Sequence, residues 1–142
     1  MIVEMDIIIK LLLATLLGGL IGFLREIGGK AAGLRTHILV TLGSSLLAII
    51  SIYIGLEFEG ADVGRIAAGV VTGIGFIGAG AIIRDRGQIR GITTAASIWI
   101  CAAIGLTVGV GLYATAIAAT AITLIVLEIL RHIEKKYIKK EI

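Results

Sequence analysis

The stretch Arg65–Gly111, RIAAGVVTGIGFIGAGAIIRDRGQIRGITTAASIWICAAIGLTVGVG, decides the fold of this chain. It consists of two glycine-rich apolar runs joined by a short loop that carries three arginines. Apolar runs of this length can cross a bilayer as helices, and glycines at this spacing let membrane helices pack closely. A basic loop between two such runs indicates the cytoplasmic side of a membrane.

The composition of the whole chain supports the same interpretation. Its 142 residues are 58% hydrophobic, with a mean hydropathy of +1.07. A soluble domain of this size could not keep so much apolar surface in solution. We therefore predict an all-α membrane protein with a single membrane domain over residues 1–142. The acidic start, MIVEMD, differs from the basic leading segment of a signal peptide, so we expect the first apolar run to remain as a span.

Five apolar runs are predicted to span the membrane, because a span needs about 17–25 residues. The fourth is short and could extend toward Gly111, where Gly109-Val110-Gly111 leaves room only for a tight turn. A basic tail, residues 131–142, follows the fifth. The runs cover residues 7–24, 38–56, 66–83, 93–108 and 112–130.

The charges predict the orientation of these spans. All but Lys10 and Arg65 of the 13 basic residues lie in the first loop, the third loop or the tail. By the positive-inside rule these segments are cytoplasmic, and the N-terminus is outside. The net charge is +3, and the basic residues sit at the ends of apolar runs. We therefore expect them to contact the headgroups of the lipid bilayer and not nucleic acid.

The first and third loops resemble each other. The sequence LREIGGKAAGLRTH in the first and IRDRGQIRGITTA in the third each begin with an Arg–acid pair and reach a Gly-aliphatic-X-Thr motif. This similarity indicates two helical hairpins of the same orientation followed by a fifth span, as parallel repeats in transporters are arranged. The alternative is that any positive-inside loop between two membrane helices looks like this.

Small residues predict where helices approach closely. Several glycine pairs are four residues apart, a spacing that lets helix backbones touch in lipid. We expect the third span to be either the central helix or a contact in a homo-oligomer, and packing within one chain is the alternative. The predicted packing positions are Gly18, Gly22, Gly69, Gly73, Gly75, Gly78, Gly80, Gly105 and Gly109.

Polar residues at the cytoplasmic ends of the spans form the candidate functional cluster. His37 follows Thr36 at the mouth of the second span; a histidine at headgroup level is usually structural, and the alternative is a functional role within this polar cluster. The cluster consists of Arg25, Glu26, Arg35, Thr36, His37, Arg84, Asp85, Thr93 and Thr94.

The sequence offers no Ser-His-Asp arrangement, metal-ligand cluster or phosphate loop, so we predict no enzyme activity, no cofactor and no metal site. One acid, Glu128, lies within a span, and its spacing predicts a local ion pair with Arg131 and His132. Magnesium prefers carboxylate and carbonyl oxygens. The near absence of intramembrane carboxylates therefore argues against a magnesium transporter that works alone.

Four blocks of sequence carry a family resemblance: GGLIGFLRE, AGLRTHILVTLGS, RIAAGVVTGIGFIGAGAII and RGITTAASIWICAAIGLTVGVGLY. With these blocks the chain resembles the N-terminal membrane domain of the MgtC/SapB family. Longer members continue into a soluble cytoplasmic domain, so this sequence resembles a short member that lacks it. Positions matching the family motifs are Arg25, Glu26, Gly33, Leu34, Arg35, Thr36, His37, Arg65, Gly73, Gly75, Gly78, Gly80, Gly91, Thr93 and Thr94.

The resemblance implies a protein of the cytoplasmic membrane of a bacterium or archaeon, tied to growth when magnesium is scarce. Some members of the family are virulence factors, and regulation of other membrane proteins has been proposed for some. We therefore expect a non-enzymatic protein of magnesium homeostasis or stress adaptation that forms a homo-oligomer and contacts other membrane proteins. The alternative is a small transporter or channel for an ion or solute, either magnesium or an anion favoured by the basic cytoplasmic mouth.

Overall fold

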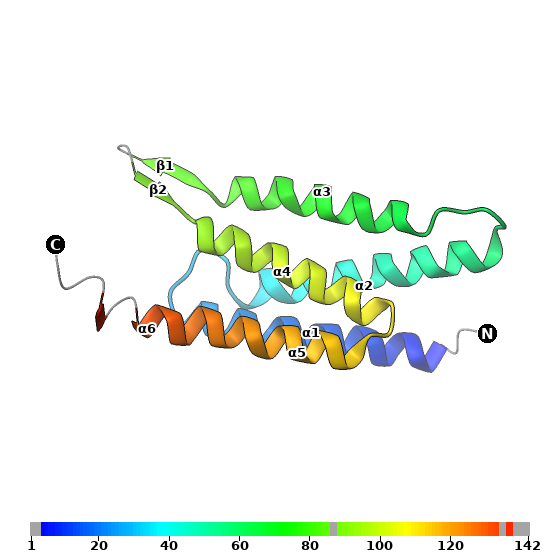
Figure 1. Ribbon diagram of the computed structural model, residues 1–142, viewed down its shortest axis with the longest axis horizontal. Coiled ribbons are helices and arrows are strands. Elements are labelled where there is room, and N and C mark those ends of the chain that lie inside the picture. The colour runs from blue at the N-terminus through cyan, green and yellow to red at the C-terminus, as the bar shows by residue number, and fades with distance from the viewer. Residues whose placement is uncertain (1–3, 86–87, 134–135, 138–142) are drawn as a thin grey trace.

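The computed structural model describes residues 4–85, 88–133 and 136–137. The long helices lie side by side and alternate in direction along the chain (Figure 1). The helices are α1 (Glu4–Ile27), α2 (Leu34–Glu57), α3 (Gly64–Gly80), α4 (Ile92–Gly109) and α5 (Tyr113–Ile125), and α5 continues through the π-helical segment η1 (Val126–Leu130) into α6 (Arg131–Ile133).

Four of these helices are long and apolar enough to cross a membrane: α1, α2, α4 and the continuous helix Tyr113–Ile133. The remaining one, α3, is equally apolar but has 17 residues. The predicted helical character of all five runs is confirmed. The third helix, however, ends at Gly80, before the predicted end of its span at residue 83.

The short loop predicted after the third run contains a two-stranded ribbon. Strands β1 (Ile83–Asp85) and β2 (Gln88–Arg90) pair antiparallel, with Ile83 opposite Arg90. Gly91 then turns the chain into α4 at a φ of 90°, a conformation that glycine adopts without a steric penalty. A Cβ at Gly91 would also lie only 2.0 Å from the carbonyl oxygen of Ala81, so two constraints favour glycine here.

The centre of the bundle is occupied by α4 rather than by α3, contrary to one of our two expectations for the third span. Nine residues of α4 are buried, against three of α3. Figure 1 shows α3 on the outside of the bundle, while α4 lies between it and the layer that contains α1 and α5. The main core cluster joins α1, α4 and α5 through Ala14, Leu17, Ile21, Cys101, Ile104, Val108 and Ala116.

Glycines bring α1 and α4 into close contact with α2 at Thr41. A Cβ at Gly18 would lie 2.5 Å from the Thr41 hydroxyl oxygen, and one at Gly105 would lie 2.2 Å from the Thr41 carbonyl oxygen. Gly22 and Gly109 make similar approaches to α2 at Leu34 and Ser45. Close backbone contact of this kind supplies van der Waals attraction where apolar burial gains nothing from the lipid.

Glycines of α3 have different surroundings. A Cβ at Gly78 would make ordinary contact with Ala95 of α4, at 3.6 Å. At Gly69, Gly73, Gly75 and Gly80 a Cβ would meet no atom of the described chain within 4 Å, so these positions face open space in the single chain.

The two ends of the bundle differ. The end of α1, the β-ribbon and the end of α5 share one end (Figure 1), which we call the ribbon end. The start of α1, the α2–α3 connection and the α4–α5 connection share the other. There Tyr113 donates a hydrogen bond of 3.1 Å to Asp6, which ties the start of α5 to α1.

Candidate functional site

The candidate site lies at the ribbon end, around Arg25 in the last turn of α1. The Arg25 side chain reaches α4, where its Nη2 donates a hydrogen bond to the hydroxyl of Thr94. Only 5% of Arg25 is exposed, and its Nε has no hydrogen-bond partner among the described residues. Because a buried charge is costly unless it is fully paired, this arginine is an unusual choice for a purely structural position.

A chain of hydrogen bonds continues from Thr94 to His37. The Ser97 hydroxyl lies 2.8 Å from the Thr94 carbonyl oxygen and 3.0 Å from Nε2 of His37. His37 is fully buried on α2, and its Nδ1 lies 2.7 Å from the carbonyl oxygen of Gly33. These contacts join the ends of α1, α2 and α4 in one network, Arg25–Thr94–Ser97–His37, which we call the buried network.

The hydroxyl hydrogen of Ser97 faces two possible acceptors in the buried network, one on His37 and one on Thr94. The Gly33 carbonyl can only accept, so Nδ1 of His37 carries a hydrogen. In a neutral imidazole Nε2 is then an acceptor, and the single hydroxyl hydrogen of Ser97 serves both Nε2 and the Thr94 carbonyl. A change in the position of His37 therefore changes the hydrogen bonding of Thr94.

Glu26 acts next to the network but not within it. Its carboxylate accepts a 2.9 Å hydrogen bond from the backbone N–H of Leu34, the first residue of α2. Gly33 precedes this helix and offers no side chain to cap it. A Cβ at Gly33 would lie 1.7 Å from the Glu26 carboxylate, so glycine makes room for a cap that comes from α1. An acid at this helix N-terminus is also favoured by the helix dipole.

Other predicted members of the cluster lie away from the buried network. Arg35 and Thr93 are exposed at the starts of α2 and α4, and Arg84 is exposed on β1. Thr36 is half-buried beside Arg35. Asp85 lies on β1, and its side chain is outside the part of the chain that the structure describes.

Two residues of the site were missed by the sequence reasoning. Ser97 completes the network, and its signal was its position three residues after Thr94 on the same face of α4. Arg131, from the start of α6, lines a cavity of about 630 Å³ together with Arg25, Lys30, Thr93 and Thr94. The predicted contacts of Glu128 are confirmed: its carboxylate lies 3.8 Å from Arg131 and 3.5 Å from His132.

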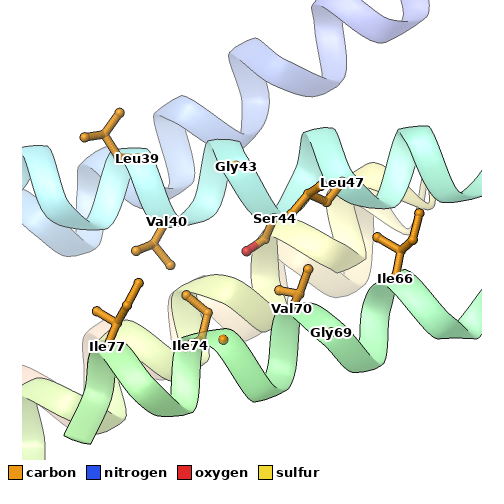
Figure 2. Close-up of a pocket in the computed structure, with 11 residues that line it drawn as sticks. Leu39, Val40, Gly43, Ser44, Leu47, Ile66, Gly69, Val70, Ile74 and Ile77 are labelled. Carbon is orange, nitrogen blue, oxygen red and sulfur yellow. The ribbon is translucent and has the colours of Figure 1, made fainter. Parts of the chain in front are cut away.

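A second hollow, also of about 630 Å³, lies between α2 and α3. Figure 2 shows Val40 and Ser44 of α2 pointing toward α3, and Val70 and Ile74 of α3 pointing toward α2. None of its described lining residues is ionisable, so this apolar groove offers no group for catalysis or for binding a charge.

Metal-binding groups are sparse in the described chain. Over residues 4–85, 88–133 and 136–137, no three His, Cys, Asp or Glu side chains come close enough to hold a metal ion. Cys101 is buried in the core of the bundle, and its thiol is free.

A bundle of long apolar helices with a buried polar network at one end defines a helical membrane protein. This chain belongs to the MgtC family, whose model matches residues 11–136.

Among its relatives is Escherichia coli K12 YhiD, named as a candidate magnesium transporter, which is 46% identical over 95% of this chain. Bacillus subtilis SapB is 39% identical over 94% of the chain, and Salmonella typhimurium MgtC is 44% identical over 82%. The chain spans 65%, 60% and 49% of the lengths of these three proteins. No solved structure matches it.

Proposed function

We propose that this chain is a non-enzymatic protein of the cytoplasmic membrane that acts in magnesium homeostasis or adaptation to low magnesium by modulating other membrane proteins. Membership of the MgtC family and the name of the relative YhiD support the connection with magnesium. The chain covers only part of those relatives, so the activity of the full-length proteins is carried over as part of the proposal.

The observation that favours modulation over transport is the charge of the buried site. Among the described residues of the buried network, the charged side chain is the guanidinium of Arg25, and Lys30 and Arg131 line the same cavity. Positive charges repel a divalent cation most strongly where water is scarce. A magnesium path would instead need oxygen ligands, chiefly carboxylates.

The proposal includes five spans, with the N-terminus outside and the ribbon end in the cytoplasm. The basic residues of the described chain, apart from Lys10 and Arg65, belong to segments at the ribbon end, which supports this orientation. At 1.5 Å per residue α3 is about 26 Å long. That is slightly less than a hydrocarbon core of about 30 Å, a mismatch that local thinning of the bilayer can accommodate. The tandem-hairpin repeat remains part of this proposal.

Homo-oligomer formation is also proposed. Gly75 and Gly80 of α3 are open and do not line the hollow between α2 and α3, so they would let a second helix approach closely from outside the chain. Their exposure supports the proposal because a contact within the chain does not use them.

A second candidate function is transport of a small anion. The cavity at the ribbon end favours it, because basic side chains and hydroxyls line this hollow of about 630 Å³. Under this alternative the buried network would contact the transported solute.

The test is growth of the native host, with its own gene deleted, in limiting magnesium. The wild-type chain and Arg90→Gln, an exposed change on β2, are expected to restore growth. Arg25→Gln is expected not to restore it at equal membrane abundance. Full growth with Arg25→Gln would overturn the role assigned to the buried network, and no growth with the wild-type chain would overturn the proposed function.

A further inference from the structure

The cavity at the ribbon end is lined by both polar and apolar side chains. The polar residues come from the end of α1, the loop after it, the start of α4 and the start of α6. They are Arg25, Lys30, Thr93, Thr94 and Arg131, and none of the described residues that line the cavity is acidic. Three cations therefore line this hollow, and a smaller hollow lined by the same three cations also includes Glu128.

Two of these cations, Arg25 and Arg131, line the same hollow. Glu128 lies 3.8 Å from Arg131 on the same continuous helix. Placing like charges around one hollow costs free energy, and an anion between them reverses that cost.

The start of α4 adds backbone donors to the cavity. Gly91 and Ile92 line it, and the structure gives α4 no side-chain cap. The first N–H groups of a helix lack partners within the helix, and the helix dipole favours an anion at this point. Phosphate groups are commonly bound at such helix starts.

Arg25 supplies an observation independent of the helix start. It is 95% buried, since its exposed fraction is 5%, and its Nε is shielded from solvent with no partner among the described residues. A guanidinium has five N–H donors in a fixed plane that matches phosphate geometry. Its Nη2 is already bonded to Thr94 at the edge of the cavity, so the Arg25 fork is held in place beside it.

The cavity also has an apolar lining. It consists of Ile89 from the ribbon, Ile92 from α4, and Val126, Leu127 and Leu130 from η1. A ligand that suits both kinds of lining carries a negative group together with hydrocarbon.

We propose that this cavity binds the phosphate group of an anionic phospholipid, with Arg25, Arg131 and the start of α4 holding the phosphate and the η1 side chains holding the glycerol and the first acyl carbons. A free phosphate compound shares the recognising chemistry and is distinguished below. The assignment concerns a ligand of the ribbon end and does not depend on the proposed role in magnesium homeostasis.

The test uses the full chain, freed of lipid in a neutral detergent and titrated in a calorimeter. The probes are dioctanoyl phosphatidylglycerol, dioctanoyl phosphatidylcholine with the same chains, and inorganic phosphate. Phosphatidylglycerol is expected to bind at a saturable site with one lipid per chain, and more tightly than phosphatidylcholine. Binding of inorganic phosphate as tight as that of phosphatidylglycerol would assign the site to a free phosphate compound and overturn the lipid.

Variants locate the binding. Arg131→Gln is expected to weaken phosphatidylglycerol binding about tenfold, because one charge-assisted hydrogen bond is lost. Thr93→Val is a second test in case Arg131→Gln fails to fold. Valine is nearly equal to threonine in shape and the position is exposed at the start of α4, so this variant should fold and should weaken binding severalfold. Arg90→Gln is the control, because it removes a cation at the same end of the bundle. Arg90 follows the cavity-lining Ile89 on β2, so its side chain lies on the opposite face of the ribbon. Binding by this variant should stay within about twofold of wild type.

Three results would overturn the assignment. One is the absence of saturable phosphatidylglycerol binding by folded protein. Another is equal affinity for phosphatidylcholine and phosphatidylglycerol. The third is binding by Arg131→Gln and Thr93→Val that matches Arg90→Gln, which would place the lipid elsewhere on the helix surface.

Discussion

Arg25 at the end of α1 donates a hydrogen bond to the hydroxyl of Thr94 in the first turn of α4, a residue 69 positions further along the chain. The bond fastens the first helix to the central one at the ribbon end. It also holds a charged group where only 5% of the residue is exposed. A protein that needed only the helix contact could use a neutral side chain here.

This relationship predicts a separation of stability from function. Arg25→Gln removes the cost of burying a charge, and the amide can still bond to the Thr94 hydroxyl. We therefore expect an apparent melting temperature in detergent equal to or above that of wild type, together with loss of growth in limiting magnesium. Arg90→Gln serves as the control for charge. A fall in melting temperature with growth preserved would show that Arg25 is structural.

Replacing a glycine by alanine is predicted to change stability in opposite directions in α3 and α4. Gly105→Ala would place a Cβ 2.2 Å from the Thr41 carbonyl oxygen, so α2 and α4 must separate. We expect a loss of about 1–3 kcal/mol or more from overpacking. Gly73→Ala meets no described atom within 4 Å and replaces glycine by a better helix former, so stability should stay equal or rise by up to about 1 kcal/mol. Thermal unfolding of both variants side by side measures the difference, and equal losses would contradict the packing described here.

The buried network predicts graded losses at α2 and α4. Ser97→Ala removes the hydroxyl that joins His37 to Thr94 and is expected to cost about 1 kcal/mol. His37→Ala removes both ring contacts and leaves a void in a fully buried position, so its cost should be larger. If the double variant loses only as much as His37→Ala alone, the two residues act through one network. Additive losses would show that they act separately.

Topology can be tested by labelling single cysteines in a Cys101→Ala background. Gln88→Cys lies on β2 at the ribbon end, and Asp62→Cys lies in the connection between α2 and α3 at the other end. Both positions are exposed. Gln88→Cys should react with an impermeant reagent only from the cytoplasmic side, and Asp62→Cys only from outside. The reverse pattern would overturn the proposed orientation.

Much of the fold follows from the sequence because membrane helices carry their signal locally. Long apolar runs fix the helices, and the close approach of Gly18 and Gly105 to Thr41 reflects a spacing visible in the sequence. The position of α3 was harder to predict, because a glycine-rich face suits contact within one chain and contact between chains equally well. The short ribbon was missed because three-residue strands such as Ile83–Asp85 give too few alternating residues to recognise.

The site was predicted in its residue types but not in its pairings. Arg25, His37 and Thr94 were all expected at one end of the bundle, but their joining through Ser97 depends on how α4 packs against α1 and α2. Arg131 enters the cavity because α5 runs back beside α1 and its last turns end near Arg25. Neither arrangement is encoded in a local motif.

The central claim, that this chain serves magnesium homeostasis without carrying magnesium itself, is tested most directly by flux. Purified protein would be sealed into liposomes containing a magnesium-sensitive dye, beside protein-free liposomes and liposomes with Arg25→Gln. A magnesium ionophore added at the end of each run shows that the dye responds. Folded protein that gives no entry above the protein-free rate is the predicted result. Saturable magnesium entry through the wild-type chain, lost in Arg25→Gln, would contradict the account.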